Sequence, residues 1–421
     1  MIQVIDLLPG VTLRCCRAEK FKQGCLSFQF LRPMSEQEAA LNALIPAVLL
    51  RGTAKRPDLR AITEALDDLY GASVGTLVRR IGDYQTAGFY CGFIEDRYAL
   101  EGDKILKPMI GLLLELLLEP LMEDGAFCRE YVEGEKRNLI IAIESERNDK
   151  RTYAASQLLR RMCQGDSFAV PRLGEKEQVE AITPESAWAH YRKLLEQSPI
   201  EVFYVGTAQA ETVAQLLREG LSGLRRSPVC LPEQTGFRGA DGGAFSEEME
   251  IAQAKLAMGF VTPITNRCEE FAAMQVLNTL FGAGMTSKLF MNVREKMSLC
   301  YSIGSGYYGS KGIMTVSAGI DSVKEPVVRQ EILSQLEQCQ AGNITAEELT
   351  AAKEAILSGL RGAYDSPGAI EGYESTAAIG GLRWSVEEYY RAVEAVAPED
   401  VAAAAGTVKH HTTFFLKGVA Q

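Results

Sequence analysis

The side chains best suited to chemistry in this sequence are those of Arg294 and Tyr301, which stand seven positions apart. Apolar residues recur at helical spacing around Arg294, and a strand-like, aromatic stretch begins at Tyr301. A guanidinium and a phenol can both donate hydrogen bonds to an oxygen atom. A helix that carries the arginine and a strand that carries the tyrosine could therefore point both groups at one spot. On spacing alone, the simpler interpretation is a surface arginine that pairs with an acid and a tyrosine that packs.

The local pattern also predicts how the helix of this pair begins. Gly282 and Gly284 permit a tight turn, and Thr286 or Ser287 can cap the helix that follows. A phosphate-binding role is not expected, because a Gly-x-Gly pattern by itself is weak evidence for one.

The first half of the chain predicts a series of strands and helices. Alternating residues predict strands at 11–15, 25–30, 73–79, 86–93 and 200–206. Helical spacing predicts helices at 36–50, 59–69, 99–118, 124–148, 153–162 and 210–221. Proline and glycine interrupt residues 226–246, which we expect to form a linker.

The second half repeats this order, which indicates an internal duplication. The strand that ends at Pro263 mirrors the one that ends at Pro33, and Leu299-Cys300-Tyr301 mirrors Asp68-Leu69-Tyr70. The expected elements are a strand at 256–263, two strands within 302–319, helices at 325–339 and 345–361, and a last strand at 412–418.

Two copies of this pattern predict an α+β fold built from two homologous domains. Each domain should hold a mainly antiparallel sheet with helices packed on one face, and the two should face each other across a cleft. A chain of 421 residues is also longer than one core usually holds. We expect an N-terminal domain over 1–225, the linker over 226–246 and a C-terminal domain over 247–421.

Composition excludes several other classes of protein. Lysine and arginine number 44 against 55 aspartates and glutamates, a net charge of −11 without a basic tract, so nucleic acid is not an expected partner. The ten cysteines lack a Cys-x-x-Cys pair and are expected to be free thiols in a reducing cytosol. The N-terminus does not have the pattern of a signal peptide. The most apolar run, 110–118, is too short to span a membrane, so a cytoplasmic protein is expected.

Three short runs carry a resemblance to a known family: Ser287-Lys288-Leu289-Phe290, Val293-Arg294-Glu295-Lys296 and Leu299-Cys300-Tyr301-Ser302. Together they resemble the C-terminal signature of the pitrilysin-type, inverted-zincin metallopeptidases. That family includes insulin-degrading enzyme and the mitochondrial processing peptidase. The resemblance extends over nearly the whole chain. It implies that Arg294 and Tyr301 face a zinc site in another domain and hold the substrate backbone.

The zinc motif of that family is absent from its expected place. Active members carry His-x-x-Glu-His on the first helix, where the two histidines bind zinc and the glutamate activates water. Gly52-Thr53 aligns this motif with Ala43-Leu44-Ile45-Pro46-Ala47, so Ala43 and Ala47 replace the histidines and Pro46 replaces the glutamate. The third ligand position is Ala142, which follows the retained Glu135. Methyl groups and a proline ring offer zinc no donor, so we expect no metal in this chain.

Other residues near this motif leave alternatives open. Glu144 could be the third ligand position if the register slips. Pro46 removes a helix N–H and should kink the helix or begin it there. His190, His410 and His411 are expected to be packing or surface residues.

The resemblance implies a zinc-free subunit of a heterodimeric zinc peptidase. The partner, a paralogous subunit with His-x-x-Glu-His, would hold the zinc ion. This chain would supply Arg294 and Tyr301 to peptide cleavage and would be inactive alone. In isolation it could form a homodimer.

Two alternatives belong to other classes. In the first, the chain is a non-catalytic peptide-binding or scaffold homologue, and Arg294 and Tyr301 pack or bind peptide without cleavage. In the second, it is a hydrolase with other chemistry, but a Gly-x-Ser-x-Gly, a phosphate loop and a convincing Cys–His pair are all missing. A neighbouring gene that lacks His-x-x-Glu-His would favour the scaffold.

Overall fold

The computed structural model describes residues 2–418, which form two compact units. The first unit comprises residues up to 144, 170–233 and 364–375, and the second comprises residues 145–169, 234–363 and 376 onward. Each unit is therefore built from several segments of the chain. The domain boundaries expected from the sequence, 1–225 and 247–421, stay a prediction.

The sheet of the first unit runs in the order β1-β2-β8-β3-β5-β4. Its strands are β1 (Ile2–Leu8), β2 (Val11–Arg17), β3 (Gln23–Pro33), β4 (Ser73–Ile81), β5 (Tyr84–Ile94) and β8 (Ile200–Gly206). β2 and β8 run parallel, and the other neighbours are antiparallel. A short pair, β6 (Met122–Glu123) and β7 (Ala126–Phe127), lies apart from this sheet.

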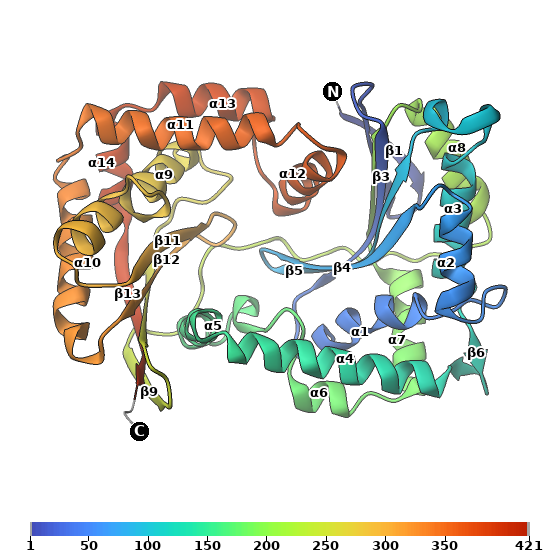
Figure 1. Ribbon diagram of the computed structural model, residues 1–421, viewed down its shortest axis with the longest axis horizontal. Helices are drawn as coiled ribbons and strands as arrows, with labels where there is room; N and C mark the ends of the chain where they lie inside the picture. The colour runs from blue at the N-terminus through green and yellow to red at the C-terminus, as the bar shows by residue number, and fades with distance from the viewer. Residues whose placement is uncertain (1, 419–421) are drawn as a thin grey trace. The chain divides into compact units, whose positions relative to one another are not determined.

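Helices cover one face of this sheet (Figure 1). They are α1 (Ala39–Leu49), α2 (Leu59–Asp67), α3 (Leu106–Leu118), α4 (Arg129–Asn148), α6 (Lys176–Glu180), α7 (Pro184–Gln197) and α8 (Ala210–Leu221). Leu26, Phe28 and Phe30 alternate along β3 and point into the same buried core as α1 and α3. The period-two pattern of β3 thus sets which face holds the helices.

The sheet of the second unit runs in the order β11-β12-β10-β13-β9. Its strands are β9 (Ala244–Met249), β10 (Ala254–Val261), β11 (Ser302–Tyr308), β12 (Ile313–Ile320) and β13 (Lys409–Gly418). Read from the other edge, β9-β13-β10-β12-β11 matches β2-β8-β3-β5-β4, and the parallel pair β13–β9 matches β8–β2. The internal duplication predicted from the sequence is confirmed in strand order and direction.

The helices of the second unit follow the same order (Figure 1). They are α5 (Lys150–Met162), α9 (Phe271–Asn278), α10 (Glu325–Gln340), α11 (Ala346–Gly362), α12 (Pro367–Gly380), α13 (Val386–Ala395) and α14 (Pro398–Thr407), and residues 367–375 of α12 belong to the first unit. Two segments, Thr279–Ala283 and Leu289–Lys296, are π-helical. Ser287 Oγ accepts a hydrogen bond from the Phe290 N–H (3.3 Å), one of the two predicted caps.

A helical segment also lies on the opposite face of each sheet. In the second unit, Ala154 and Leu158 of α5 pack against Ala257 and Leu416. In the first unit, the residues at 364–375 include Ile370, which packs against Cys25 of β3. The α+β expectation is confirmed, with mixed sheets that carry helices.

One predicted helix begins later than its pattern suggests. The stretch 99–118 was expected to be continuous, but α3 begins at Leu106. Glu101 and Gly102 have φ of 53° and 84°, which a right-handed helix cannot contain. Among residues 2–418, no helix is long and apolar enough to cross a membrane.

Candidate functional site

The helix that aligns with the zinc motif is intact, but the motif positions carry no side-chain atoms that could bind zinc. Ala43 and Pro46 are buried on α1, and Ala47 is half-buried beside them. Pro46 lies inside the helix, seven residues after its first residue, so the alternative that it begins the helix is wrong. Ala142, on α4, is exposed. Between residues 2 and 418, no three His, Cys, Asp or Glu side chains form a group that could hold a metal ion.

A neutral hydrogen-bond network occupies the inner side of α1. His190 Nε2 lies 2.7 Å from Asn42 Oδ1, and Asn42 Nδ2 donates to Gln85 Oε1 at 2.8 Å. Gln85 Nε2 donates to the carbonyls of Ala39 and Arg172. An amide oxygen can only accept, so His190 donates through Nε2. Burial lowers the pKa of His190 to about 4, although the charge of Glu38 opposes this shift. His190 is therefore a neutral packing residue, as expected from the sequence.

An ion cluster closes the start of the same helix. Glu38 accepts two hydrogen bonds from the Arg32 guanidinium, at 2.8 and 2.9 Å, and a third from Lys193. Burial raises the pKa of Glu38, but the bonds to Lys193 and Arg32 outweigh it and the net shift is downward. This carboxylate is fully engaged within the first unit.

The retained carboxylate of the degenerate motif also has partners. Glu135 is buried on α4, 3.4 Å from the Arg51 guanidinium, and it accepts a hydrogen bond from Asn138 at 3.1 Å. Glu144, the alternative ligand position, pairs instead with Lys176 at 2.6 Å. Both carboxylates therefore serve ion pairs of the protein itself.

Arg294 is accessible on the second unit. It lies in the π-helical segment Leu289–Lys296, and 40% of its side chain is exposed. Its guanidinium stacks 4.6 Å from the centre of the Phe290 ring and lies 3.6 Å from Glu295. The Arg294 side chain stays at the surface in spite of both contacts. Its ion pair with Glu295 therefore contributes little to stability.

Tyr301 is more exposed still, at 59%, and immediately precedes β11. Its backbone N–H donates to Gly319, and its hydroxyl donates to Asp321 at 3.0 Å. This hydrogen bond raises the pKa of the phenol. In the first unit, the Tyr70 hydroxyl also donates to a carboxylate, that of Asp103, at 2.7 Å.

The chain turns sharply between these two residues. Ser298 has a φ of 50°, and the Ser298 N–H donates to the Arg294 carbonyl. Burial raises the pKa of the Cys300 thiol to about 11, and the charge of Arg294 lowers it in part. Within residues 2–418, no hydrogen bond joins Arg294 to Tyr301. Sequence reasoning missed Asp321, although its place directly after β12 could have suggested it.

Comparison with known proteins gives consistent results. Residues 181–356 match the family model described as the peptidase M16 inactive domain. A probable inactive metalloprotease of Bacillus subtilis, YmfF, is 29% identical over 409 residues, which cover 97% of this chain and 96% of that protein. A conserved protein of Enterococcus faecalis V583 has a crystal structure with a TM-score of 0.92 and 26% identity over 100% of this chain and 99% of that chain. A chain of complex III from Candida albicans shares the fold, with a TM-score of 0.76 and 15% identity over 99% and 96% of the two chains.

Two duplicated α+β units, with no metal donors where a zinc motif would lie, define an inactive relative of the two-domain metallopeptidases. The chain thus matches the M16 peptidase family, the pitrilysin-type family that its sequence resembles, through the inactive-domain model and through an inactive relative along nearly its whole length.

Proposed function

We propose that this protein is the zinc-free subunit of a heterodimeric M16 peptidase in the cytoplasm. The partner would be a paralogous subunit that holds zinc with its own His-x-x-Glu-His motif. The observation that supports this role is the contrast between the two sites. The positions at Ala43, Pro46, Ala47 and Ala142 have no ligand atoms, whereas Arg294 and Tyr301 are both kept, with Arg294 partly exposed and Tyr301 exposed.

This chain would contribute hydrogen-bond donors to the shared site. Tyr301 would donate to the oxyanion that develops on the substrate carbonyl, and Arg294 would hold a neighbouring carbonyl of the peptide. A donor aimed at charge that grows in the transition state contributes about 3–4 kcal/mol. The residues of the degenerate motif cannot bind zinc, so the metal chemistry would belong to the partner.

Tyr301 would first have to exchange its acceptor. Its hydroxyl now donates to Asp321, and a substrate oxygen would replace that carboxylate. Water competes for an exposed hydrogen bond of this kind, so it contributes less than a donor aimed at an oxyanion in a closed site. The exchange is therefore energetically reasonable once a substrate is held in place.

The substrate would be an extended peptide that adds a strand to a sheet edge. β4 and β11 each lie at the end of their sheet, and β11 directly follows Tyr301. Main-chain hydrogen bonds would supply affinity with little dependence on side-chain sequence, which suits a loosely specific peptidase.

The experiment is a kinetic comparison of heterodimers reconstituted with variants of this chain. Arg294→Ala and Tyr301→Phe should each lower kcat by about 10²–10³, the usual effect of removing one oxyanion donor. Lys296→Ala and Tyr308→Phe are matched controls, since both residues are exposed on neighbouring positions of the same unit. Turnover that is unchanged in both Arg294→Ala and Tyr301→Phe would overturn the proposal.

The alternative is a non-catalytic peptide-binding or scaffold role. The hydrogen bond from Tyr301 to Asp321 favours it, because the phenol already has an acceptor within the chain. The fold shared with a chain of complex III is also consistent with a structural role. In that case, complexes would form with a partner but would cleave no peptide, and both variants would leave complex formation unchanged.

A further inference from the structure

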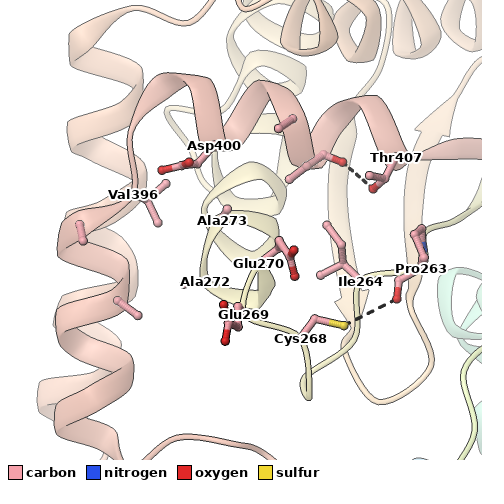
Figure 2. Close-up of a pocket in the computed structure, with 14 residues that line it drawn as sticks. Pro263, Ile264, Cys268, Glu269, Glu270, Ala272, Ala273, Val396, Asp400 and Thr407 are labelled. Carbon is pink, nitrogen blue, oxygen red and sulfur yellow. Dashed lines mark hydrogen bonds between the residues drawn. The ribbon is translucent and has the colours of Figure 1, made fainter.

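The second unit contains a pocket that the Arg294–Tyr301 pair does not use. It lies between the start of α9, the segment after β10, the end of α13 and α14 (Figure 2) and has a volume of about 670 Å³. Six of the 14 residues that line it are alanines, and Glu270 and Asp400 also line it; the alanines are Ala272, Ala273, Ala392, Ala395, Ala403 and Ala404. This volume lies within the range of ligand-binding pockets.

The internal duplication identifies the corresponding place in the first unit. α7 and α14 both begin with Pro-Glu and lead into the matching strands β8 and β13. α1 and α9 both follow a glutamate, Glu38 in the first unit and Glu270 in the second. The two glutamates are therefore equivalent, and the pocket wall made by α14 corresponds to α7.

In the first unit, side chains of the protein fill this place and neutralise the charge of Glu38. Glu38 is paired with Arg32 from the end of β3 and with Lys193 from α7. His190, one turn earlier on α7, fills the neighbouring space with its buried ring. A carboxylate, two cations and an imidazole thus close the site.

In the second unit, the equivalent carboxylate has lost both cations. Threonines stand in their places, Thr262 for Arg32 and Thr407 for Lys193, and their hydroxyls lie 2.7 Å apart in a hydrogen bond with each other. Within residues 2–418, the side chain of Glu270 makes no ion pair or hydrogen bond, and it does not cap its own helix. Ala404 stands where the first unit has His190, which explains the open space.

We propose that this pocket binds the side chain of a lysine or arginine from a peptide, with Glu270 as its ion-pair partner. The ligand would supply the cation that Arg32 and Lys193 supply in the first unit. The alkyl stem of a lysine or arginine can lie along the alanine wall while its charged end reaches the carboxylate. The other two carboxylates of the pocket already have partners. Asp400 accepts a hydrogen bond from the Ala397 N–H at 2.8 Å, and Glu269 pairs with Arg383 at 3.0 Å. Glu270 is therefore the carboxylate that is left for a ligand.

Charge complementarity supports a cationic ligand. No lysine or arginine is among the residues that line the described pocket, and three of them are acidic. The net charge of the whole chain, −11, also favours approach of a basic peptide. This inference concerns the chain alone and does not depend on a catalytic partner.

The test is calorimetric titration of the full chain with a blocked pentapeptide, Ala-Leu-Lys-Leu-Ala, and with the same peptide carrying norleucine for lysine. The lysine peptide should bind, and the norleucine peptide should bind about tenfold more weakly or worse, because it keeps the alkyl stem without the charge. Glu270→Gln should weaken binding of the lysine peptide by a similar factor. Thr407→Lys should also weaken it, since it restores the internal cation of the first unit.

Glu337→Gln is the matched control, because it removes an exposed carboxylate from α10 of the same unit. Its affinity for the lysine peptide should equal that of the wild type. Thermal melts verify that the Thr407→Lys variant is folded. If that variant is unfolded, the affinity of the Glu270→Gln variant decides the test. Equal binding of both peptides, no measurable binding, or an unchanged affinity in Glu270→Gln would each overturn the proposal.

Discussion

The polar side chains around α1 in the first unit have a structural role. Next to Ala43, one of the degenerate ligand positions, Asn42, Gln85 and His190 form a closed and neutral network. Buried polar groups are stable only when they are hydrogen-bonded, and this network satisfies that condition. The residues around α1 therefore stabilise the fold instead of holding a metal.

This network makes stability depend on pH through His190. Its pKa is about 4 in the folded state against an ordinary value of 6.5, so the unfolded chain binds more protons between these values. Stability should fall as the pH falls through this window, by about 2 kcal/mol between pH 7 and pH 5. Urea unfolding of the wild type and of His190→Gln at both pH values measures this effect. The variant should show the shallower dependence, since glutamine does not titrate, and equal slopes would contradict the account.

At the level of elements, one buried ion pair joins three separate segments of the second unit. Asp166 follows α5 and accepts from Lys311 in the β11–β12 turn at 2.9 Å and from the Arg238 N–H at 3.1 Å. The Lys311 and Asp166 side chains are 0% and 3% exposed. This pair fixes the end of α5 against the sheet.

Removing one partner of this pair should be costly. Lys311→Met leaves the Asp166 carboxylate buried without its cation, so we expect a loss of about 3–5 kcal/mol in the free energy of unfolding. The double variant Lys311→Met with Asp166→Asn should recover part of the loss, because no charge remains buried. Lys417→Met breaks only the exposed pair with Glu248 and should change stability by less than about 1 kcal/mol. A Lys311→Met protein as stable as this control would show that the pair is unimportant.

The sequence predicted much of this element-level structure. The helix at 210–221 and the strand at 200–206 were predicted to their observed ends. Local periodicity suffices for such elements, because each buries one continuous face. The late start of α3 was missed because it depends on positive φ at Glu101 and Gly102. The role of Asp321 was missed because its partner, Tyr301, lies 20 positions away in the sequence; the place of Asp321 directly after β12 was the one local sign of it.

At the scale of the whole molecule, segments distant in sequence complete each unit. Residues 364–375 belong to the first unit, where Glu371 is fully buried against β3 and β4. Glu371 accepts from Ser27 at 2.7 Å, from Gln29 at 3.0 Å and from Arg79 at 2.9 Å. A late segment of the chain is thereby tied to β3 and β4, so the first unit is complete only when residues 364–375 are present.

Glu371→Ala should release this segment. Arg79 and Gln29 would lose their shared acceptor, and we expect a loss of about 3 kcal/mol in the free energy of unfolding. Trypsin should also cut faster after Arg361, which lies near the end of α11, three residues before the segment. Glu387→Ala, at an exposed position of α13, is the control for both measurements. Unchanged proteolysis at Arg361 would mean that other contacts hold residues 364–375 in place.

In the proposed heterodimer, this chain completes the active site of a zinc-binding partner. The most direct test is to titrate it into the isolated partner and follow cleavage of a fluorogenic peptide. We expect negligible activity in either protein alone and activity that rises until one equivalent of this chain has been added. An isolated partner that is already as active as the mixture would contradict the claim.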